Sequence, residues 1–327
     1  MSNIVNNSCD LPRKEKINIS HLYSQFGVFI ILLVAMAAAT LMSDSFLSAR
    51  NLVNILRQNA VITIIACGAQ VVLICGEVDL SPGSVAAFGG CIATMVMAST
   101  HSLILAVAAG LGIGMIIGLI NGTVITFFKI PSFIMTLATM QAARGALLAV
   151  TKAQPISGVD NFSWLGQGYV GPIPIPIIIL VFILTITWFI MNKLRFGRYM
   201  YAVGGNSSAA KASGINVSSI KTRAFMYQGI MAGLGGTILM SRLDSGQPTG
   251  ALGYEFDAIT AVIIGGTSMS GGIGNIYGTI AGAMFVAVLV NIMTLTNVSA
   301  YYQQIVQGLI IAIAVIIDVR VRASKKI

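Results

Sequence analysis

The chain is poor in charge, and its few charged residues are unevenly spaced. Residues 258–317 contain no Asp, Glu, Lys or Arg, and only 9% of the whole chain is charged against 56% hydrophobic. A helix needs about 20 apolar residues to cross the hydrocarbon core of a bilayer, and an unpaired charge there costs several kcal/mol. The long uncharged runs therefore predict an integral membrane protein and exclude a soluble globular domain.

Cysteine and histidine are scarce as well. No two of the four cysteines form a CxxC pair, and the two histidines, His21 and His101, stand alone. Metal and redox sites need several such ligands at short spacing. We therefore predict no metal site. A membrane-embedded enzyme is disfavoured for the same reason, because it needs a convergent nucleophile, base or metal ligands.

A nucleotide-binding loop is also missing. No Gly-Lys-Ser or Gly-Lys-Thr occurs in the chain, and no predicted strand precedes the dense glycine run at residues 265–274. We therefore predict no cofactor in this chain. Glycines this dense break a helix, and unwound backbone in a membrane is tolerated only where it is buried or lines a cavity. The run is either a pathway or gate element or a plain tight turn, and the candidates are Gly265, Gly266, Gly271 and Gly272.

What the sequence does contain is a series of apolar segments. A window of about 19 residues predicts about ten membrane-spanning helices and an all-α fold. The predicted spans are residues 26–42, 60–76, 82–99, 103–127, 133–150, 173–191, 224–240, 257–269, 278–296 and 302–317. The first could be a signal peptide, since Ala35-Met36-Ala37 resembles a cleavage motif, but the apolar run continues to Met42 and favours a retained helix.

The basic residues stand in ones and threes at the ends of apolar segments, so they predict the orientation of the chain and no nucleic-acid partner. The polar leader at residues 1–25 carries Arg13, Lys14 and Lys16, residues 192–223 carry six basic residues and no acid, and the tail at residues 319–327 is basic. Lys and Arg collect in cytoplasmic loops, and the predicted spans separate these three segments by six and then four crossings. We expect both termini to be cytoplasmic, residues 151–172 and 241–256 to lie outside, and residues 26–318 to form one transmembrane domain.

Two similar acidic motifs suggest an internal repeat. Gly76-Glu77-Val78-Asp79 follows the second span and Tyr254-Glu255-Phe256-Asp257 follows the seventh, and a helix with glycines four residues apart comes two spans after each. Spans two to five would begin outside and spans seven to ten inside, which is the pattern of an inverted repeat in transporters. The alternative is coincidence in a glycine-rich chain.

The glycines four residues apart have a simpler purpose. In lipid, Gly at this spacing allows helix backbones to approach closely. We expect tight helix packing at Gly114, Gly118 and Gly122, and at Gly229 and Gly233.

The acidic residues near membrane depth are candidates for function. Glu77 and Asp79 precede Ser81-Pro82, which is also a good helix start, so both carboxylates either serve the pathway or simply cap a helix. Arg144, inside the fifth span, would pair with one of them or reach the outer surface. Ser81, Glu255 and Asp257 complete the pathway or gate candidates. Polar span residues either line a pathway or bond a neighbouring helix, and these are Gln70, Asn121, Thr136, Gln141 and Asn291.

The polar segment at residues 192–223 predicts a short helix bounded at both ends. Two flexible glycines precede Asn206 and Ser207, either of which is a good N-cap, and Gly214 is a good C-cap. Its small side chains suit insertion into a groove on a partner protein. The candidate residues are Gly204, Gly205, Asn206, Ala209, Ala210, Ser213 and Gly214.

Several motifs together resemble one family. The chain is similar to the ribose, xylose, arabinose and galactoside permeases, the membrane subunits of bacterial ATP-binding-cassette sugar importers. The resemblance covers about residues 26–318 and rests on Phe196-Gly197-Arg198, Gly204-Gly205-Asn206, Ser213-Gly214-Ile215, Gly76-Glu77-x-Asp79-Leu80-Ser81-x-Gly83-Ser84 and Gly265-Gly266-Thr267-Ser268 with Gly271-Gly272-x-Gly274. Pro82 departs from the family, where a small or aliphatic residue is usual.

The resemblance implies a type II-like permease in the bacterial inner membrane. It implies a second permease subunit in a homodimer, a cytoplasmic ATPase that binds the ATP, and a periplasmic sugar-binding protein, with residues 204–214 as the coupling helix to the ATPase. The substrate would be a ribose-like pentose or a related hexose. An ion-coupled secondary transporter of a small polar solute stays open as the alternative, because Glu77, Asp79, Glu255 and Asp257 would suit one.

Overall fold

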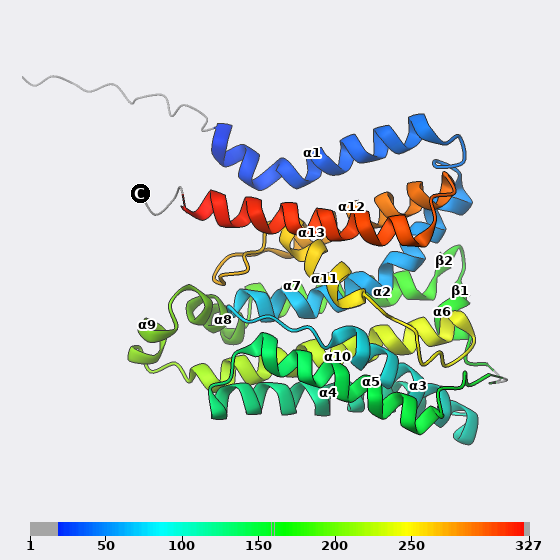
Figure 1. Ribbon diagram of the computed structural model, residues 1–327, viewed down its shortest axis with the longest axis horizontal. Helices are drawn as coiled ribbons and strands as arrows, with labels where there is room; N and C mark the ends of the chain where they lie inside the picture. The colour runs from blue at the N-terminus through cyan, green and yellow to red at the C-terminus, as the bar shows by residue number, and fades with distance from the viewer. Residues whose placement is uncertain (1–18, 158, 160, 324–327) are drawn as a thin grey trace, which may run out of the picture.

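The computed structural model describes residues 19–157, 159 and 161–323, and its helices lie roughly side by side along the long axis (Figure 1). The predicted cytoplasmic leader and tail lie partly outside the described residues, with Arg13, Lys14, Lys16, Lys325 and Lys326 among the residues not described. α1 begins and α13 finishes at the end of the molecule where α8 and α9 lie, and we call this the α8–α9 end.

Each predicted span overlaps a helix in the described residues, although the helix of the eighth, predicted at residues 257–269, already ends at Ile264. These helices are α1 (Ile19–Met42), α2 (Ala49–Ile74), α3 (Pro82–Thr100), α4 (Leu103–Phe128), α5 (Ser132–Thr151), α7 (Ile175–Asn192), α10 (Val217–Leu243), α11 (Tyr254–Ile264), α12 (Ile276–Leu295) and α13 (Ala300–Ala323). Among the described residues, α2, α3, α4, α5, α7 and α12 are long and apolar enough to cross a membrane, and Gly27–Met42 and Ala300–Ile316 are shorter apolar helices. The protein is therefore mostly helical with at least six candidate spans.

Three small elements were not predicted. The segment after α5 contains α6 (Trp164–Gln167) and a hairpin of β1 (Tyr169–Val170) and β2 (Ile173–Pro174), so the fold is not purely helical. An isolated bridge also joins Ile156 to Gly246. Two-residue strands leave no hydrophobic periodicity in the sequence, so pattern reading misses them.

The polar segment after α7 contains two helices where one was predicted. α8 (Arg195–Gly205) precedes α9 (Ser207–Ala212), so Gly204 and Gly205 are the last residues of a helix and not a flexible linker. The sequence did hold a signal for α8, because Gly197, Met200 and Val203 recur every three residues and are all buried.

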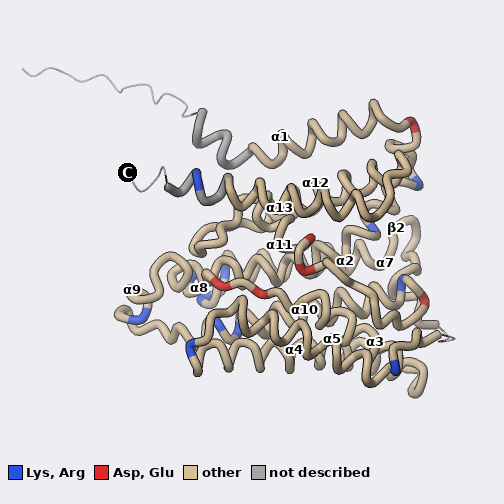
Figure 2. The backbone as a smooth tube through the Cα atoms, in the orientation of Figure 1, with Lys and Arg blue, Asp and Glu red and all other residues tan. Residues whose placement is uncertain are grey.

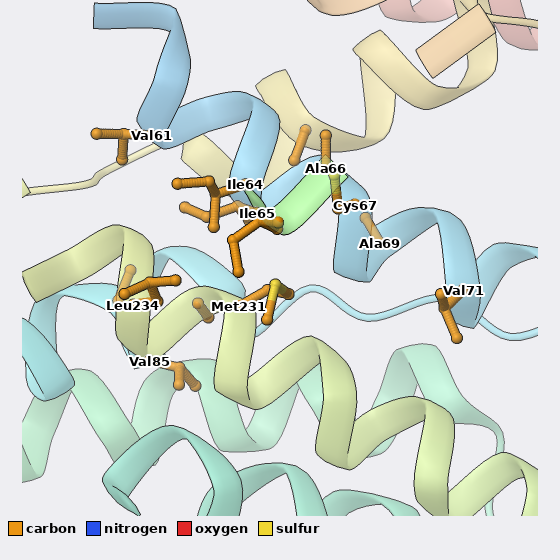
Figure 3. Close-up of a cluster of buried hydrophobic side chains, with 14 of the residues drawn as sticks. Val61, Ile64, Ile65, Ala66, Cys67, Ala69, Val71, Val85, Met231 and Leu234 are labelled. Atoms are coloured by element: carbon orange, nitrogen blue, oxygen red, sulfur yellow. The ribbon is translucent and has the colours of Figure 1, made fainter. Parts of the chain in front are cut away.

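The core is built around α2 and α10. α10 packs against α2, α3 and α4, while α2 packs against α11 and α12. Ile64 and Ile65 of α2 face Met231 and Leu234 of α10, with Val85 of α3 beside them (Figure 3). The two helices share one continuous apolar cluster.

Glycines let these helices touch backbone to backbone, as predicted. A Cβ atom on Gly114 would overlap the carbonyl oxygen of Gly229, and one on Gly118 would overlap that of Phe225. The same contact recurs between α12 and α11, where a Cβ atom on Gly278 would overlap the carbonyl oxygen of Gly265. Close packing of this kind replaces the hydrophobic driving force that is missing in lipid.

Charges are segregated along the molecule. Basic positions gather near its two ends, and several acidic positions lie between them (Figure 2). This is the distribution of a protein that places its middle in a bilayer, because basic side chains are stable in the headgroup regions.

Candidate functional site

Two helices of the bundle begin in the interior of the molecule. α2 ends at Ile74 and α3 begins at Pro82, and α10 ends at Leu243 and α11 begins at Tyr254. The irregular residues 75–81 enter from the α8–α9 end and residues 244–253 from the opposite end (Figure 1). The two helix starts meet, because a Cβ atom on Gly83 would overlap Oε2 of Glu255. We call residues 75–81 the first break and residues 244–253 the second break.

Asp79 organises the end of the first break. Its Oδ1 accepts hydrogen bonds from the Ser81 amide at 2.8 Å and the Ser81 hydroxyl at 2.6 Å, and the carboxyl is almost fully buried. Asn121 of α4 donates to the same hydroxyl at 3.2 Å. Ser81 is the N-cap residue of α3, yet its side chain binds Asp79 and Asn121 and makes no capping bond. α3 therefore begins where the sequence predicts, but the Ser81 hydroxyl bonds to side chains and not to the backbone of the helix.

Two amides of the first break are satisfied by α5. Val78 donates its N–H to Ser132 Oγ at 3.1 Å, and Leu80 donates to Thr136 Oγ1 at 3.1 Å. Irregular backbone at membrane depth is stable only with such partners. Thr136, one of the polar residues considered for a pathway, therefore serves here as an acceptor for the broken backbone.

Glu77 lies at the other end of the first break and forms a salt bridge with Lys221 of α10. Both side chains are partly exposed, 13% of Glu77 and 22% of Lys221. Arg144 was the partner considered for Glu77 or Asp79. The cation at Glu77 is Lys221, and Asp79 bonds to Ser81.

Arg144 holds the second break. Its Nη1 donates to the carbonyl oxygen of Pro248 at 2.7 Å and to that of Gly250 at 3.0 Å. Arg144 and Glu255 also lie close enough to attract one another electrostatically. Glu255 is 6% exposed and rests on the first turn of α3, where the positive end of the helix dipole favours a carboxylate.

Asp257 points elsewhere. Together with Thr260 of α11 and Gln307 of α13 it lines a small, mainly apolar pocket between α11, α12 and α13. Glu255 and Asp257 are therefore close in sequence but serve different surfaces.

The other polar span residues fall into three groups. Asn121 binds Ser81, and Asn291 of α12 pairs with Asn51 of α2 at 2.9 Å, so both join neighbouring helices. Gln70 is fully buried. Gln141 is exposed on the outer face of α5.

The glycine run links α11 to α12 at the α8–α9 end. α11 ends at Ile264 and α12 begins at Ile276. Gly266, Gly271 and Gly272 have φ of +85°, +86° and +75°, which only glycine adopts readily. The Ser268 amide donates to the Ile273 carbonyl at 3.0 Å, so the run forms a compact loop and breaks the helix as expected.

α9 begins and ends where the sequence indicated. Asn206 is the N-cap, and its side chain accepts a hydrogen bond from the Ala209 amide at 2.9 Å. At the other end Gly214 has φ +81° and the Ile215 amide donates to the Ala210 carbonyl, which is a Schellman ending with Ser213 as the C-cap. Ala209 is exposed and Ala210 is 5% exposed, so only the former belongs to the outer face of α9.

Tyr201 of α8 was not singled out from the sequence. Its hydroxyl donates to the Gly274 carbonyl at 2.7 Å, and burial raises the pKa of its phenol, which keeps the donor protonated. α8 is thereby fastened to the glycine run.

Comparisons with known proteins agree with one another. Residues 51–315 match the family described as the permease component of branched-chain amino acid transport systems. The ribose import permease protein RbsC of Haemophilus influenzae is 40% identical over 295 residues, which cover 89% of this chain and 91% of the relative. The Bacillus subtilis protein of the same name is 40% identical over 93% of this chain and 96% of its own length.

A second kind of relative is nearly as similar. The L-arabinose transport system permease protein AraH of Escherichia coli K12 is 35% identical and covers 97% of both chains. No solved structure matches the chain significantly. The family match and these relatives span nearly all of the described helices, and the chain therefore belongs to this family of membrane permease components.

Proposed function

We propose that the chain is the membrane permease subunit of an ATP-binding-cassette importer and moves a monosaccharide across the bacterial inner membrane. A ribose-like pentose or a related hexose is the expected substrate, since ribose and arabinose permeases cover 89% and 97% of the chain. The observation that carries the proposal is α9, a short capped helix with a small exposed residue, Ala209, at one end of an apolar bundle. Such a helix suits a groove on a separate ATPase, which would bind the ATP.

The α8–α9 end is proposed to face the cytoplasm, with both termini there and ten membrane crossings. The six basic residues and absent acids of residues 192–223 support this orientation. The second break would then open to the outside, where a periplasmic binding protein delivers the sugar. The first break would open to the cytoplasm.

An inverted repeat is proposed for α2–α5 and α10–α13. Several helix contacts correspond under this exchange: α10 packs on α3 and α4, and α2 packs on α11 and α12. The contacts of α3 with α4 and α5 likewise match those of α11 with α12 and α13. The two breaks, which enter from opposite ends, take equivalent places in it.

A second copy of the chain is the proposed neighbour in the membrane. Gln141 and Gly145 lie on the exposed face of α5, and Gln304 and Gly308 on that of α13. Neither glycine has an atom within 4 Å of the place of a Cβ atom. Small and polar side chains on a lipid-facing surface are typical of helix interfaces, so these faces suit a homodimer whose two copies enclose the sugar path.

An ion-coupled transporter is the second candidate, favoured by the acidic residues inside the bundle. Reconstitution in lipid vesicles separates the two. With the ATPase and binding protein from the same bacterium present and ATP enclosed on the ATPase side, we expect uptake of radiolabelled ribose or arabinose that stops with a non-hydrolysable ATP analogue. Uptake by the chain alone, driven by a proton or sodium gradient, would overturn the importer proposal.

A further inference from the structure

Three segments that are far apart in the sequence meet at the α8–α9 end, backbone against backbone. They are the end of α2, the end of α8 and the glycine run. A Cβ atom on Gly204 would overlap the Ile74 carbonyl oxygen and lie 2.6 Å from the Gly272 amide nitrogen. One on Gly271 would lie 2.8 Å from the Gly204 carbonyl oxygen and 2.9 Å from Gly76. We call this contact of Gly76, Gly204, Gly271 and Gly272 the glycine junction.

Hydrogen bonds close the glycine junction on two sides. The Gly272 amide donates to the Ile74 carbonyl at 2.9 Å, which joins the run to α2. The Tyr201 hydroxyl donates to the Gly274 carbonyl at 2.7 Å, which joins the run to α8. Since no side chain separates the three backbones, a displacement of one cannot be absorbed by a change of rotamer.

The glycine junction also has open space beside it. An open polar hollow of about 380 Å³ is lined by Gly76, Gly204 and Ser270 of the junction region and by Lys221, the partner of Glu77. The hollow leaves the end of α8 and the start of α9 uncovered on that side. Tight contact on one side and free space on the other are what a mechanical joint requires.

We infer that the glycine junction is the joint through which α8 and α9 move the transport path. This rests on the proposed function, in which α9 docks on an ATPase. A displacement of α9 would move α8 and with it Gly204, which contacts two segments of the bundle. One is the start of the first break, whose other end holds Asp79 and the first turn of α3. The other is the glycine run, which leads into α12.

Two helix glycines provide a matched test of the joint. Gly204→Ala inserts a methyl group into the junction, whereas Gly112→Ala adds the same group to α4, where no atom lies within 4 Å. In the complex with ATPase and binding protein, we expect Gly204→Ala to lower the sugar imported per ATP hydrolysed on the order of tenfold, within the usual range of coupling between sites. Gly112→Ala should match the wild type.

A second pair covers the case in which Gly204→Ala fails to fold. Tyr201→Phe removes only the bond to Gly274, and Tyr199→Phe is its control because Tyr199 is 40% exposed. Hydrogen exchange gives a readout besides transport. Trapping the ATPase closed should change the exchange of the Gly272 amide in the wild type, and this change should be reduced in Tyr201→Phe but not in Tyr199→Phe.

The outcomes separate the joint from the proposed function. If the wild-type complex shows no ATP-dependent uptake, the importer proposal fails. If the wild type is coupled and all four variants import as much sugar per ATP as the wild type, the junction is only structural and the inference is overturned. The same follows if hydrogen exchange at the Gly272 amide does not change when the ATPase is trapped closed.

Discussion

The two breaks are held by the same helix in chemically opposite ways. In the first break, α5 accepts hydrogen bonds from backbone amides through the hydroxyls of Ser132 and Thr136. In the second break, α5 donates to backbone carbonyls through the guanidinium of Arg144. One helix thus fastens both irregular segments, each through the atoms that its backbone leaves unpaired.

The difference lies in how the support is distributed. The first break is held by several side chains, namely Ser132, Thr136 and the hydrogen-bonded group of Asp79, Ser81 and Asn121, so that its support is shared. In the second break two carbonyls depend on one charged side chain, which also faces Glu255. Hydrogen bonds to charged groups are stronger than neutral ones, so the second break should be the more sensitive to a single substitution.

The largest effect is expected at Arg144. Arg144→Met removes the donor of both carbonyls and leaves Glu255 without its nearby cation. We expect the unfolding free energy in detergent to fall by about 3 kcal/mol, from two charge-assisted hydrogen bonds. Arg144→Lys keeps the charge but loses the planar guanidinium, so its stability should lie between those of the wild type and Arg144→Met. If Arg144→Met had the thermal stability of the wild type, the second break would be stable without a side-chain donor from α5.

The next effect is expected where the two helix starts meet. Gly83→Ala would push the methyl group into Glu255 and to 2.6 Å from the Ala251 carbonyl oxygen. Overpacking of this kind costs about 1–3 kcal/mol. Gly112→Ala on α4 is the control, because no atom lies within 4 Å of its added methyl group. Equal thermal melting of the two variants would mean that α3 and α11 separate freely.

The first break should respond less. Thr136→Val and Ser132→Ala each remove the acceptor of one backbone amide, and a buried unsatisfied donor costs about 1–3 kcal/mol. Thr136 is fully buried whereas Ser132 is 8% exposed, so we expect the larger loss at Thr136. Faster hydrogen exchange should be confined to the Leu80 and Val78 amides respectively. A global loss of protection in either variant would contradict the picture of distributed support.

The smallest effect is expected at the salt bridge that ends the first break. Lys221→Gln should lower stability by no more than about 1 kcal/mol, as partly exposed ion pairs do. The double variant with Glu77→Gln should recover part of that loss, because no carboxylate is then left alone. A loss in Lys221→Gln as large as that of Arg144→Met would reverse the ranking of the two breaks.

Much of the fold was readable from local patterns. Pro82 at the first turn of α3, Asn206 as the N-cap of α9 and Gly214 at its end act through neighbouring residues, and each stands where predicted. The packing of Gly114 and Gly118 was also readable, because a four-residue spacing defines one face of a helix.

The partners of the charged residues were not readable. Lys221 is 144 positions from Glu77, and the carbonyls that Arg144 binds are about a hundred positions away. Composition shows that a buried charge needs a partner but not which group supplies it. The same holds for Tyr201 and Gly274, which the sequence separates by 73 residues.

Sequence alone determined that this protein lives in a bilayer, where most of its long helices lie along the chain, and to which family it is similar. These properties depend on hydrophobicity, capping and glycine spacing, which act within about 20 residues. Tertiary structure decided which groups satisfy the two breaks and that the α8–α9 segment touches the glycine run. Such contacts depend on how helices distant in sequence pack together, and no local pattern encodes that arrangement.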